Sequence, residues 1–432
     1  MIKRLGMAAI VVATQALGPV RGAAVVDPAE GVRTTPLACP VDGRTVPAGA
    51  RLQSIFDAAA SGTVICLSSG EYAGPLVVRT RIILQGPADA VIRSSGEGTT
   101  IRVLADGAEL RGFTVDGSGQ RPDIMDAAVL VRAERAAARG LTIRHALFGL
   151  VAEQSSGVTF DGNHVIGDPS VPQGARGDGI RLWEVRGGSV VNNRLEDSRD
   201  IVVWYSPGNR IANNIAVRSR YGVHFMYSSD CVVSGNRFSR NIVGVFVMYS
   251  RNIAIRDNEI RDNTAADSMG FGIKDSGDLT IERNLLVNDR ECLYLDNSPF
   301  RDTDTMTVRL NTFARCSAGV TFHMSESRTT FEANRFEANN TPAAIEGGGT
   351  ARGVTWTGNY FDDYQGYDLN RDGFGDVAYE LRDLSERLVS RHPDLAFFRG
   401  SPVMTIVDIA AKAFPVLQPD TLLVDAHPRM EP

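Results

Sequence analysis

A histidine and two methionines occupy matching positions in two similar segments of the chain. Residues 222–228 have the sequence Gly-Val-His-Phe-Met-Tyr-Ser, and residues 244–250 have the sequence Gly-Val-Phe-Val-Met-Tyr-Ser. Imidazole and thioether groups are soft donors that suit Cu(I), and a flexible methionine side chain can release such an ion again. The candidate ligands for this chemistry are His224, Met226, Met248 and, from the loop that follows, Met269.

Two placements of these side chains have different consequences. If strand residues alternate between inside and outside, His224, Met226 and Met248 can surround one ion, because strands of successive coils lie roughly 4.8 Å apart. If a bend turns the methionines inward, they are ordinary core side chains. Phe246 stands where the preceding coil has its histidine, so these two coils offer a single imidazole. That composition favours a weak, passing contact with copper over a tight site.

A second histidine–methionine pair lies further along the chain, at His323 and Met324. Three further coils separate this pair from Met248, which corresponds to roughly 14 Å at the same strand spacing. This distance is too long for one ion to be shared with the first group. The pair therefore predicts a second copper site of its own.

Asparagine returns at intervals of 21 to 30 residues, and this repeat predicts the fold. Short strand-like runs with such a period, without helices between them, are typical of a parallel β-helix. A leucine-rich repeat would need a leucine scaffold that the sequence lacks. We therefore predict an all-β chain with a right-handed parallel β-helix over residues 61–360, in coils of about 22–25 residues. Its stacked corner residues are Asn163, Asn193, Asn214, Asn236, Asn258, Asn284, Asn311, Asn334 and Asn359.

The segments on either side of the repeats are predicted to close the two ends of the solenoid. Residues 25–60 form an N-terminal extension whose helical pattern at 52–60 would cover unpaired strand edges. Residues 361–432 contain a loop rich in Asp and Gly, a helix that begins after Ser401, and a tail. This helix would cap the solenoid, or dock onto another protein through residues 401–417, with Met404 and Ile409 among the contacts.

The side chains predicted to face outward form an unusually apolar row. An outer row in contact with water is normally polar. Here it includes three aromatic residues that we expect to be covered by a loop, a partner or a transferred ligand. The expected partner contacts in this row are Trp183, Trp204 and Phe246; the other members are Arg181, Val202, His224, Met226, Met248, Thr321 and His323.

The segment 368–376 resembles the opening of a calcium-binding loop, D-x-N-x-D-G. Its candidate ligands are Asp368, Asn370, Asp372 and Asp376. The twelfth position holds Tyr379 instead of Glu, and Glu380 comes one residue late, which puts the bidentate ligand in doubt. A tight Asp/Gly turn that binds nothing is an equally good interpretation.

Cysteines are few, and only two of the five precede the repeats. Cys39 and Cys66 could form a disulfide in an oxidising compartment, with two buried thiols as the alternative. Cys231, Cys292 and Cys316 lie within the repeats without C-x-x-C spacing, so we expect each to be a small core residue.

The first 24 residues have the pattern of an export signal. Lys3 and Arg4 precede an apolar run over 7–17, and small residues follow at 22–24. Without Lys3, Arg4 and Arg21 the chain has 42 basic side chains against 51 acidic ones. An acidic chain without a basic tract does not suit nucleic acid. We expect an exported, periplasmic protein that meets the membrane only through a partner.

A carbohydrate enzyme is the alternative for the whole chain, since many β-helices act on polysaccharides. A uronate lyase or C5-epimerase needs a cation and an acid/base pair within a few ångströms of one sugar. The outward cations Arg181 and Lys274 are four coils, or roughly 19 Å, apart. The outer carboxylates show no evident pair, and we expect them to be solvated corner and loop residues: Asp178, Glu184, Asp275, Asp296, Asp302 and Asp304.

At several of these segments the chain resembles the NosD family, exported accessory proteins for maturation of nitrous oxide reductase. The resemblance covers about residues 50–417, and its motifs are residues 177–183, 221–228, 244–250, 272–276, 358–368, 372–376 and 401–402. The paired Met-Tyr-Ser segments together with the Gly-Tyr-Asp and Asp-Gly-Phe-Gly-Asp ending are its most specific parts.

The resemblance implies a periplasmic, copper-binding β-helix that works with an ABC transporter, a copper chaperone and nitrous oxide reductase. It implies no catalysis by this chain. We therefore expect a non-enzymatic scaffold that handles Cu(I), with calcium as a second candidate ion.

Overall fold

The computed structural model describes residues 38–325, 328–346, 351–382, 384–398, 401–414 and 421–431. The predicted export signal at 1–24 lies outside these residues, as do positions 415–417 of the predicted docking segment. Within the described ranges, no helix combines the length and the apolar character that a membrane span requires.

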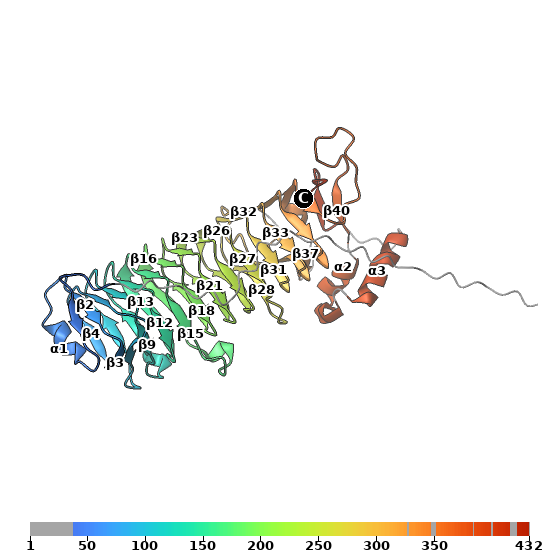
Figure 1. The fold of residues 1–432 in the computed structure, drawn as a ribbon. Helices are drawn as coiled ribbons and strands as arrows, with labels where there is room; N and C mark the ends of the chain where they lie inside the picture. The colour runs from blue at the N-terminus through green and yellow to red at the C-terminus, as the bar shows by residue number, and fades with distance from the viewer. Residues whose placement is uncertain are drawn as a thin grey trace, which may run out of the picture. The chain divides into compact units, whose positions relative to one another are not determined.

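Three parallel sheets form the walls of a solenoid, and each coil contributes one short strand to each wall (Figure 1). The predicted parallel β-helix is therefore confirmed. The 14-stranded sheet consists of β1 (Arg44–Val46), β2 (Val64–Leu67), β5 (Ile83–Gln85), β8 (Glu109–Arg111), β11 (Ala137–Arg139), β14 (Thr159–Asp161), β17 (Ser189–Val191), β20 (Arg210–Ala212), β23 (Ser229–Ser234), β26 (Arg251–Arg256), β29 (Leu279–Glu282), β32 (Met306–Arg309), β35 (Thr329–Glu332) and β38 (Thr355–Thr357).

The other two walls follow the same order along the chain. The 12-stranded sheet consists of β4 (Leu76–Val78), β7 (Ile101–Val103), β10 (Ala127–Val131), β13 (Phe148–Ser156), β16 (Ile180–Arg186), β19 (Asp200–Trp204), β22 (Tyr221–Met226), β25 (Val243–Met248), β28 (Met269–Lys274), β31 (Glu291–Asp296), β34 (Ala318–His323) and β37 (Thr341–Glu346). The 13-stranded sheet consists of β3 (Gly70–Ala73), β6 (Ala90–Arg93), β9 (Thr114–Asp116), β12 (Thr142–Arg144), β15 (His164–Ile166), β18 (Arg194–Glu196), β21 (Ile215–Val217), β24 (Arg237–Ser239), β27 (Glu259–Arg261), β30 (Leu285–Val287), β33 (Thr312–Ala314), β36 (Arg335–Glu337) and β39 (Tyr360–Phe361).

Alternation along these strands fills the interior with apolar side chains. In β22, Val223 and Phe225 are fully buried in the core, and Val245 and Val247 take the same places in β25. Close contact between successive coils explains why glycine occupies matching positions in them. A Cβ on Gly222 would lie 2.4 Å from the carbonyl oxygen of Gly244, so only glycine lets the two coils stack at this point.

The predicted asparagine ladder is present at the corner between the 14- and 13-stranded sheets. Each residue accepts hydrogen bonds from the coil before it; for example, Asn236 Oδ1 accepts from the backbone N (2.9 Å) and Nδ2 (3.0 Å) of Asn214. Asp425 occupies the position after Asn359 and accepts from its N (2.9 Å) and Nδ2 (2.8 Å). These bonds satisfy the polar backbone groups that every corner buries.

Two further corner ladders accompany it. The serine ladder consists of Ser206, Ser228, Ser250, Ser276, Ser298 and Ser325, in which each backbone N donates to the next hydroxyl. The mixed ladder, at the corner between the 13- and 12-stranded sheets, consists of Ser198, Ser219, Asn241, Asn263, Asp289, Cys316 and Asn339. In both, the residue before each ladder member mostly adopts a positive φ, which turns the chain into the next wall.

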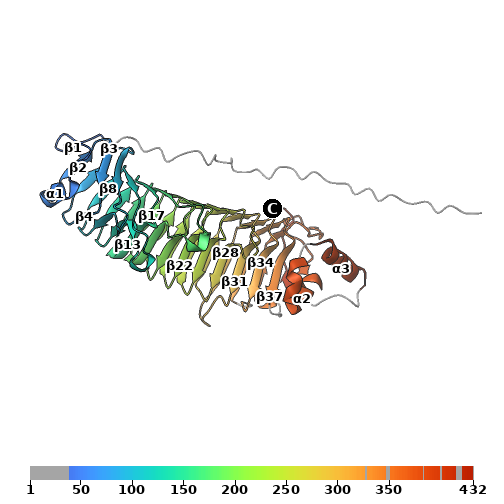
Figure 2. The same ribbon diagram turned by 90° about the horizontal axis from the view of Figure 1, so that it is seen from below.

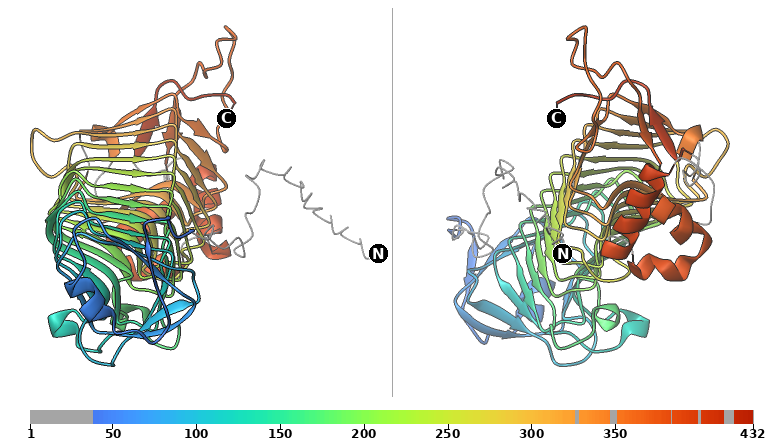
Figure 3. Two further views of the ribbon diagram at one scale, coloured as in Figure 1. Left: turned by 60° about the vertical axis from the view of Figure 1, so that its left-hand side comes forward. Right: turned by 90° about the vertical axis from the view of Figure 1, so that its right-hand side faces the viewer.

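Both ends of the solenoid carry additional elements. Helix α1 (Leu52–Asp57) buries Leu52 and Phe56 against the first coils. After β39, the antiparallel pair β40 (Tyr379–Leu381) and β41 (Leu423–Asp425) follows, and helix α2 (Leu384–Arg391) contacts both β37 and α3 (Pro402–Ala413) (Figures 2 and 3). The short 3₁₀ turns are η1 (Pro122–Ile124), η2 (Gln173–Ala175), η3 (Ala351–Gly353) and η4 (Pro393–Phe398).

Four of the five cysteines form disulfides. Cys39 pairs with Cys66, which was one of the two alternatives predicted for them, and Cys231 is a buried free thiol as expected. Cys292 and Cys316 are buried core residues as expected, and they also pair with each other, a bond that the sequence had not predicted. They stand in successive coils with Cα atoms 5.8 Å apart, within the range that a disulfide can bridge.

Candidate metal centre

The 12-stranded sheet brings the first candidate ligands together on its outer surface. Met226 pairs in register with Met248, and His224 pairs with Phe246 one coil away. Met226 and Met248 are partly exposed while their strand neighbours fill the core, so the predicted outward placement is confirmed. His224 Nε2 lies 3.4 Å from Met248 Sδ. The imidazole and the Met248 thioether therefore meet directly, and Met226 stands next to Met248 in the strand register.

Aromatic rings enclose His224. Tyr221 and Trp204 meet the imidazole edge-on with centroids 5.1 and 5.3 Å away, and Phe246 stacks on it at 5.9 Å. The histidine is consequently only 4% exposed, although it points away from the core. Burial lowers the pKa of His224 and outweighs the opposing effect of Asp200. The imidazole is thus held in the neutral form that a metal requires.

The two ring nitrogens of His224 have different neighbours. Nδ1 accepts from the indole Nε1–H of Trp204 (3.3 Å) and lies 3.7 Å from Asp200 Oδ2. In this tautomer the proton sits on Nε2, on the side of Met248. A metal at Nε2 would need the proton on Nδ1, which faces Asp200; in many metal sites a carboxylate accepts a hydrogen bond from the ligating histidine in this way.

A buried charge cluster lies on the N-terminal side of the histidine. Asp200 is fully buried and pairs with Arg220, which also stacks its guanidinium on Tyr221 at 4.3 Å. One coil earlier, Asp178 accepts from Arg181 Nη1 (2.8 Å). The expectation that Asp178 is a solvated corner residue is wrong, since its side chain is only 1% exposed. Asp304 is buried as well, and it pairs with Arg251.

The pKa values of Asp178 and Asp200 are shifted in opposite directions. Burial, and next the negative charge of Asp200, raise the pKa of Asp178 to about 6. Burial also opposes ionisation of Asp200, but the neighbouring His224 and the paired Arg220 guanidinium hold the pKa of Asp200 below its ordinary value. Strongly shifted groups next to an enclosed histidine are typical of functional sites.

Exposed tyrosines form one border of the site. Tyr205, Tyr227 and Tyr249 precede the serine ladder at positive φ, and their rings stack at 5.2 and 5.0 Å. Trp183 continues the row 5.4 Å from Tyr205. The Met-Tyr-Ser repeat contained this signal, because equal spacing in successive coils places equal side chains side by side.

Met269 stands apart from the first group. It is the first residue of β28 and not a loop residue as predicted, and it pairs with Val243 and Glu291. The residue of β28 that pairs with Met248 is Lys274, at the other end of the strand. The Met269 thioether lies over Gly272, where an added Cβ would be 3.2 Å from Sδ and 2.9 Å from the Phe246 ring.

His323 and Met324 do not form a common pocket with the first group. By register, Met248, Lys274, Asp296 and His323 occupy four successive strands, in agreement with the predicted three-coil separation. His323 Nδ1 lies 3.0 Å from Asp296 Oδ1, and Asp296 also pairs with Lys274. Met324 is exposed at the corner that follows β34.

The acidic loop at 368–376 is exposed and organised by its own hydrogen bonds. Asp368 accepts from the backbone N of Arg371 (2.6 Å) and of Gly373 (2.9 Å), and Asp376 Oδ2 accepts from Leu369 N (2.7 Å). Further bonds join Asn370 and Asp372. The ring of Tyr379, at the twelfth position, stacks on Phe361 at 3.9 Å, and Glu380 pairs with Arg382 at 2.6 Å.

The predicted partner contacts differ in exposure. Trp183, Trp204 and Phe246 are partly exposed on the outer face. Ile409 is 61% exposed on α3, but Met404 is only 6% exposed because α3 packs against α2. Met404 is therefore a packing residue of the helix pair and not a free surface contact.

The fold is shared with enzymes that act on polysaccharides. The A-module of the mannuronan C-5 epimerase AlgE6 from Azotobacter vinelandii superimposes with a TM-score of 0.55 at 17% identity, over 72% of this chain and 94% of that one. The catalytic unit of an α-1,3-glucanase from Streptomyces thermodiastaticus gives 0.58 at 17% identity, over 78% and 72%. At such low identity these likenesses show the fold alone.

Sequence relatives are more specific. The model of the family described as "Periplasmic copper-binding protein (NosD)" matches residues 156–366. A protein named "Probable ABC transporter binding protein NosD" from Stutzerimonas stutzeri is 29% identical over 84% of this chain and 86% of its own length. A protein of the same name from Pseudomonas aeruginosa is 28% identical over 84% and 87%. These matches confirm the resemblance drawn from the motifs: the chain is similar to the NosD family model over residues 156–366 and to two proteins named NosD over most of its length.

Proposed function

We propose that this chain is a non-enzymatic periplasmic accessory protein that receives and releases Cu(I) at His224, Met226 and Met248. In this proposal it serves assembly of the copper centre of nitrous oxide reductase, together with an ABC transporter and a copper chaperone. The observation that carries the proposal is the 3.4 Å approach of His224 Nε2 to Met248 Sδ, with Met226 in register beside it.

The surroundings of these donors suit transfer more than storage. Only one imidazole is available, and its tautomer is set by Trp204 and Asp200, so binding an ion requires a proton shift. The methionine side chains are partly exposed and flexible, which lets a donor protein approach them directly. The exposed tyrosine row beside them offers aromatic contacts of the kind that protein interfaces use.

Anaerobic titration with Cu(I) in the presence of a competing chelator tests the copper proposal. The variant Met226→Leu/Met248→Leu keeps the volume of both side chains and removes both thioethers. We expect it to lose roughly tenfold or more in affinity. Met430→Leu, at a partly exposed methionine that belongs to neither histidine–methionine group, is the matched control and is expected to bind as the parent does. Equal affinities of the double variant and the parent would remove these methionines from the proposal.

The transporter contact is proposed for helix α3. Val403, Ile406 and Ile409 lie on its exposed side, and Phe414 follows at its end. A helix that only caps the solenoid would not need four exposed apolar side chains, because Met404 and Ala411 on its other side already supply the packing. The exposed side chains therefore favour contact with a partner protein. We expect Ile406→Ser/Ile409→Ser to abolish binding to the transporter's membrane subunit in detergent. Val41→Ser, exposed at the other end of the chain, is the control, and retained binding by the double variant would leave α3 as a cap.

Calcium at the loop 368–376 is a separate proposal, supported by the oxygen donors of Asp368, Asn370, Asp372 and Asp376. Calorimetric titration with Ca²⁺ tests it, with Asp368→Asn as the variant expected to lose binding. No heat of binding by the parent chain would leave the acidic turn network as the whole explanation.

A uronate lyase or epimerase is the alternative function, and it is suggested by the shared fold. The acid pair that could serve such chemistry, Asp178 and Asp200, is 1% and 0% exposed, so no sugar reaches it in this conformation. Turnover of alginate or pectin oligomers by the purified chain would favour this alternative over the accessory role.

A further inference from the structure

The mixed ladder is interrupted in the coil of β30 and β31, where an aspartate replaces an asparagine. Asn263 N donates to Asp289 Oδ1 (3.0 Å), as it would to an asparagine. The position of the asparagine amide NH₂ is instead taken by Asp289 Oδ2. This oxygen is buried and has no hydrogen-bond partner among the described residues. A carboxylate left in this way is costly unless a proton or a cation compensates it.

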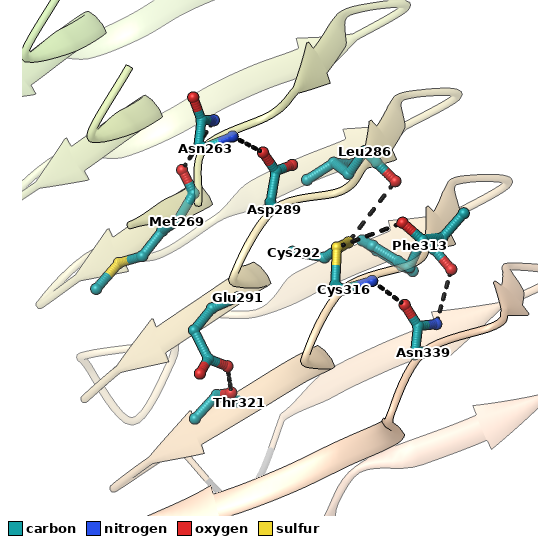
Figure 4. The surroundings of a disulfide bond; sticks show 11 residues. Asn263, Met269, Leu286, Asp289, Glu291, Cys292, Phe313, Cys316, Thr321 and Asn339 are labelled. Atoms are coloured by element: carbon teal, nitrogen blue, oxygen red, sulfur yellow. Dashed lines mark hydrogen bonds between the residues drawn. A yellow bond between two sulfur atoms is a disulfide. The ribbon is translucent and has the colours of Figure 1, made fainter. Parts of the chain in front are cut away.

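Two sulfur atoms lie directly beside this carboxylate (Figure 4). Cys316 is the next member of the mixed ladder, and Cys292 comes from β31. One ligand atom from each of Asp289, Cys292 and Cys316 falls within 4.8 Å of the others, and all three residues are buried. Burial raises the pKa of Asp289 well above its ordinary value, as expected for a carboxylate without a compensating charge.

We infer that, once the Cys292–Cys316 disulfide is reduced, Asp289, Cys292 and Cys316 form a second, internal binding site for a thiophilic d¹⁰ cation, Cu(I). Two thiolates are the preferred donors of Cu(I), and the carboxylate supplies a third ligand. This site is separate from the outer-face donors, and it stands whether or not His224, Met226 and Met248 bind copper.

The site exists in only one redox state of the chain. A dithiol reductant transfers two electrons and two protons, which cleaves the S–S bond, leaves two thiols and converts the reductant into its own disulfide. Cu(I) then replaces the thiol protons, which pass to solvent. In the oxidised state the sulfur atoms are bonded to each other, and the thiolates that the metal needs are absent.

Cu(I) titration of the reduced and oxidised full chain, followed by the ultraviolet thiolate-to-copper charge-transfer band, tests the inference. The reduced chain is expected to show this band at one equivalent, and the oxidised chain is expected to lack it. Methionine and histidine donors give no thiolate band, so failure of the outer site does not affect this readout. All titrations are made in the Cys39→Ser/Cys66→Ser/Cys231→Ser background, so that Cys292 and Cys316 supply the only thiols after reduction.

Two variants separate a ligand role from a purely structural one. Cys292→Ser/Cys316→Ser is expected to abolish the band. Asp289→Asn restores the ladder residue and should fold well, while its affinity for Cu(I) falls at least about tenfold. Circular dichroism confirms that each variant is folded. A reduced chain without the band, or a band that survives in the serine variant, overturns the inference; unchanged affinity in Asp289→Asn overturns the three-ligand site.

Discussion

Replacing Asp178 by asparagine should stabilise the protein at neutral pH, although it removes a charged partner of Arg181. In the folded chain the pKa of Asp178 is about 6, compared with 3.8 for an ordinary aspartate. Asp178 Oδ1 has no hydrogen-bond partner among the described residues, and Asp200 repels the ionised form. The folded state therefore resists ionisation of this group more than the unfolded state does.

The sign and size of the effect follow from proton linkage. Between the two pKa values, the folded state holds a proton that the unfolded state has lost, so the free energy of unfolding falls as pH rises from about 4 to about 6. The difference between 3.8 and about 6 corresponds to roughly 3 kcal/mol. In Asp178→Asn the amide oxygen would still accept the hydrogen bond from Arg181, but the side chain would carry no charge to bury. The increase in the free energy of unfolding of the variant over the parent chain should accordingly be near zero at about pH 4 and approach roughly 3 kcal/mol at about pH 7.

Urea unfolding followed by circular dichroism at a series of pH values measures this difference. Asp302→Asn changes a fully exposed carboxylate and serves as the control, with no expected effect at any pH. Parallel pH profiles of Asp178→Asn and the parent chain between about pH 4 and about pH 7 would refute the reasoning. They would mean that groups other than Arg181 and Arg199 compensate the buried carboxylate in the folded state.

Two further substitutions test how the coils are held together. Asn236→Ala removes four side-chain hydrogen bonds to the adjoining coils and leaves buried backbone and amide groups without partners. We expect the free energy of unfolding in urea to fall by at least about 3 kcal/mol. The exposed Asn340→Ala is the control and should leave it almost unchanged. Gly222→Ala places a methyl group 2.4 Å from the Gly244 carbonyl oxygen and should lower the free energy of unfolding by about 1–3 kcal/mol or more. Gly174→Ala has open space around the new Cβ and should leave the free energy of unfolding unchanged.

The sequence was sufficient to predict the coil repeat and the outward placement of Met226 and Met248, the methionines of the first proposed copper site. Each corner asparagine bonds to the next, so its spacing directly records the length of a coil. Gly222 and Gly244 are the second residues of β22 and β25, and alternation from there separates Val223 and Phe225 from His224 and Met226.

Other features depended on contacts between coils whose register the sequence does not display. The insertion that carries η2 lies between β15 and β16, so the position of Asp178 relative to Asp200 was obscured and its burial was missed. The Cys292–Cys316 pair was missed for a different reason. The two cysteines are 24 residues apart, whereas residues paired between β31 and β34, such as Leu293 and Val320, are 27 apart; the cysteines therefore do not occupy equivalent positions of their coils, and their spacing gave no signal.

The asparagine ladder does not end in an asparagine, and this has a consequence for the behaviour of many copies in solution. Asp425 occupies the position that the next coil's corner would take, and residue Arg429 bridges to Tyr360 on the last short strand. A bare terminal coil would present a row of unpaired donors and acceptors, to which a second molecule could add end to end. The chain's own C-terminal segment instead pairs with this edge, so a second molecule cannot add there. A truncation before Asp425 should expose the edge and allow end-to-end association.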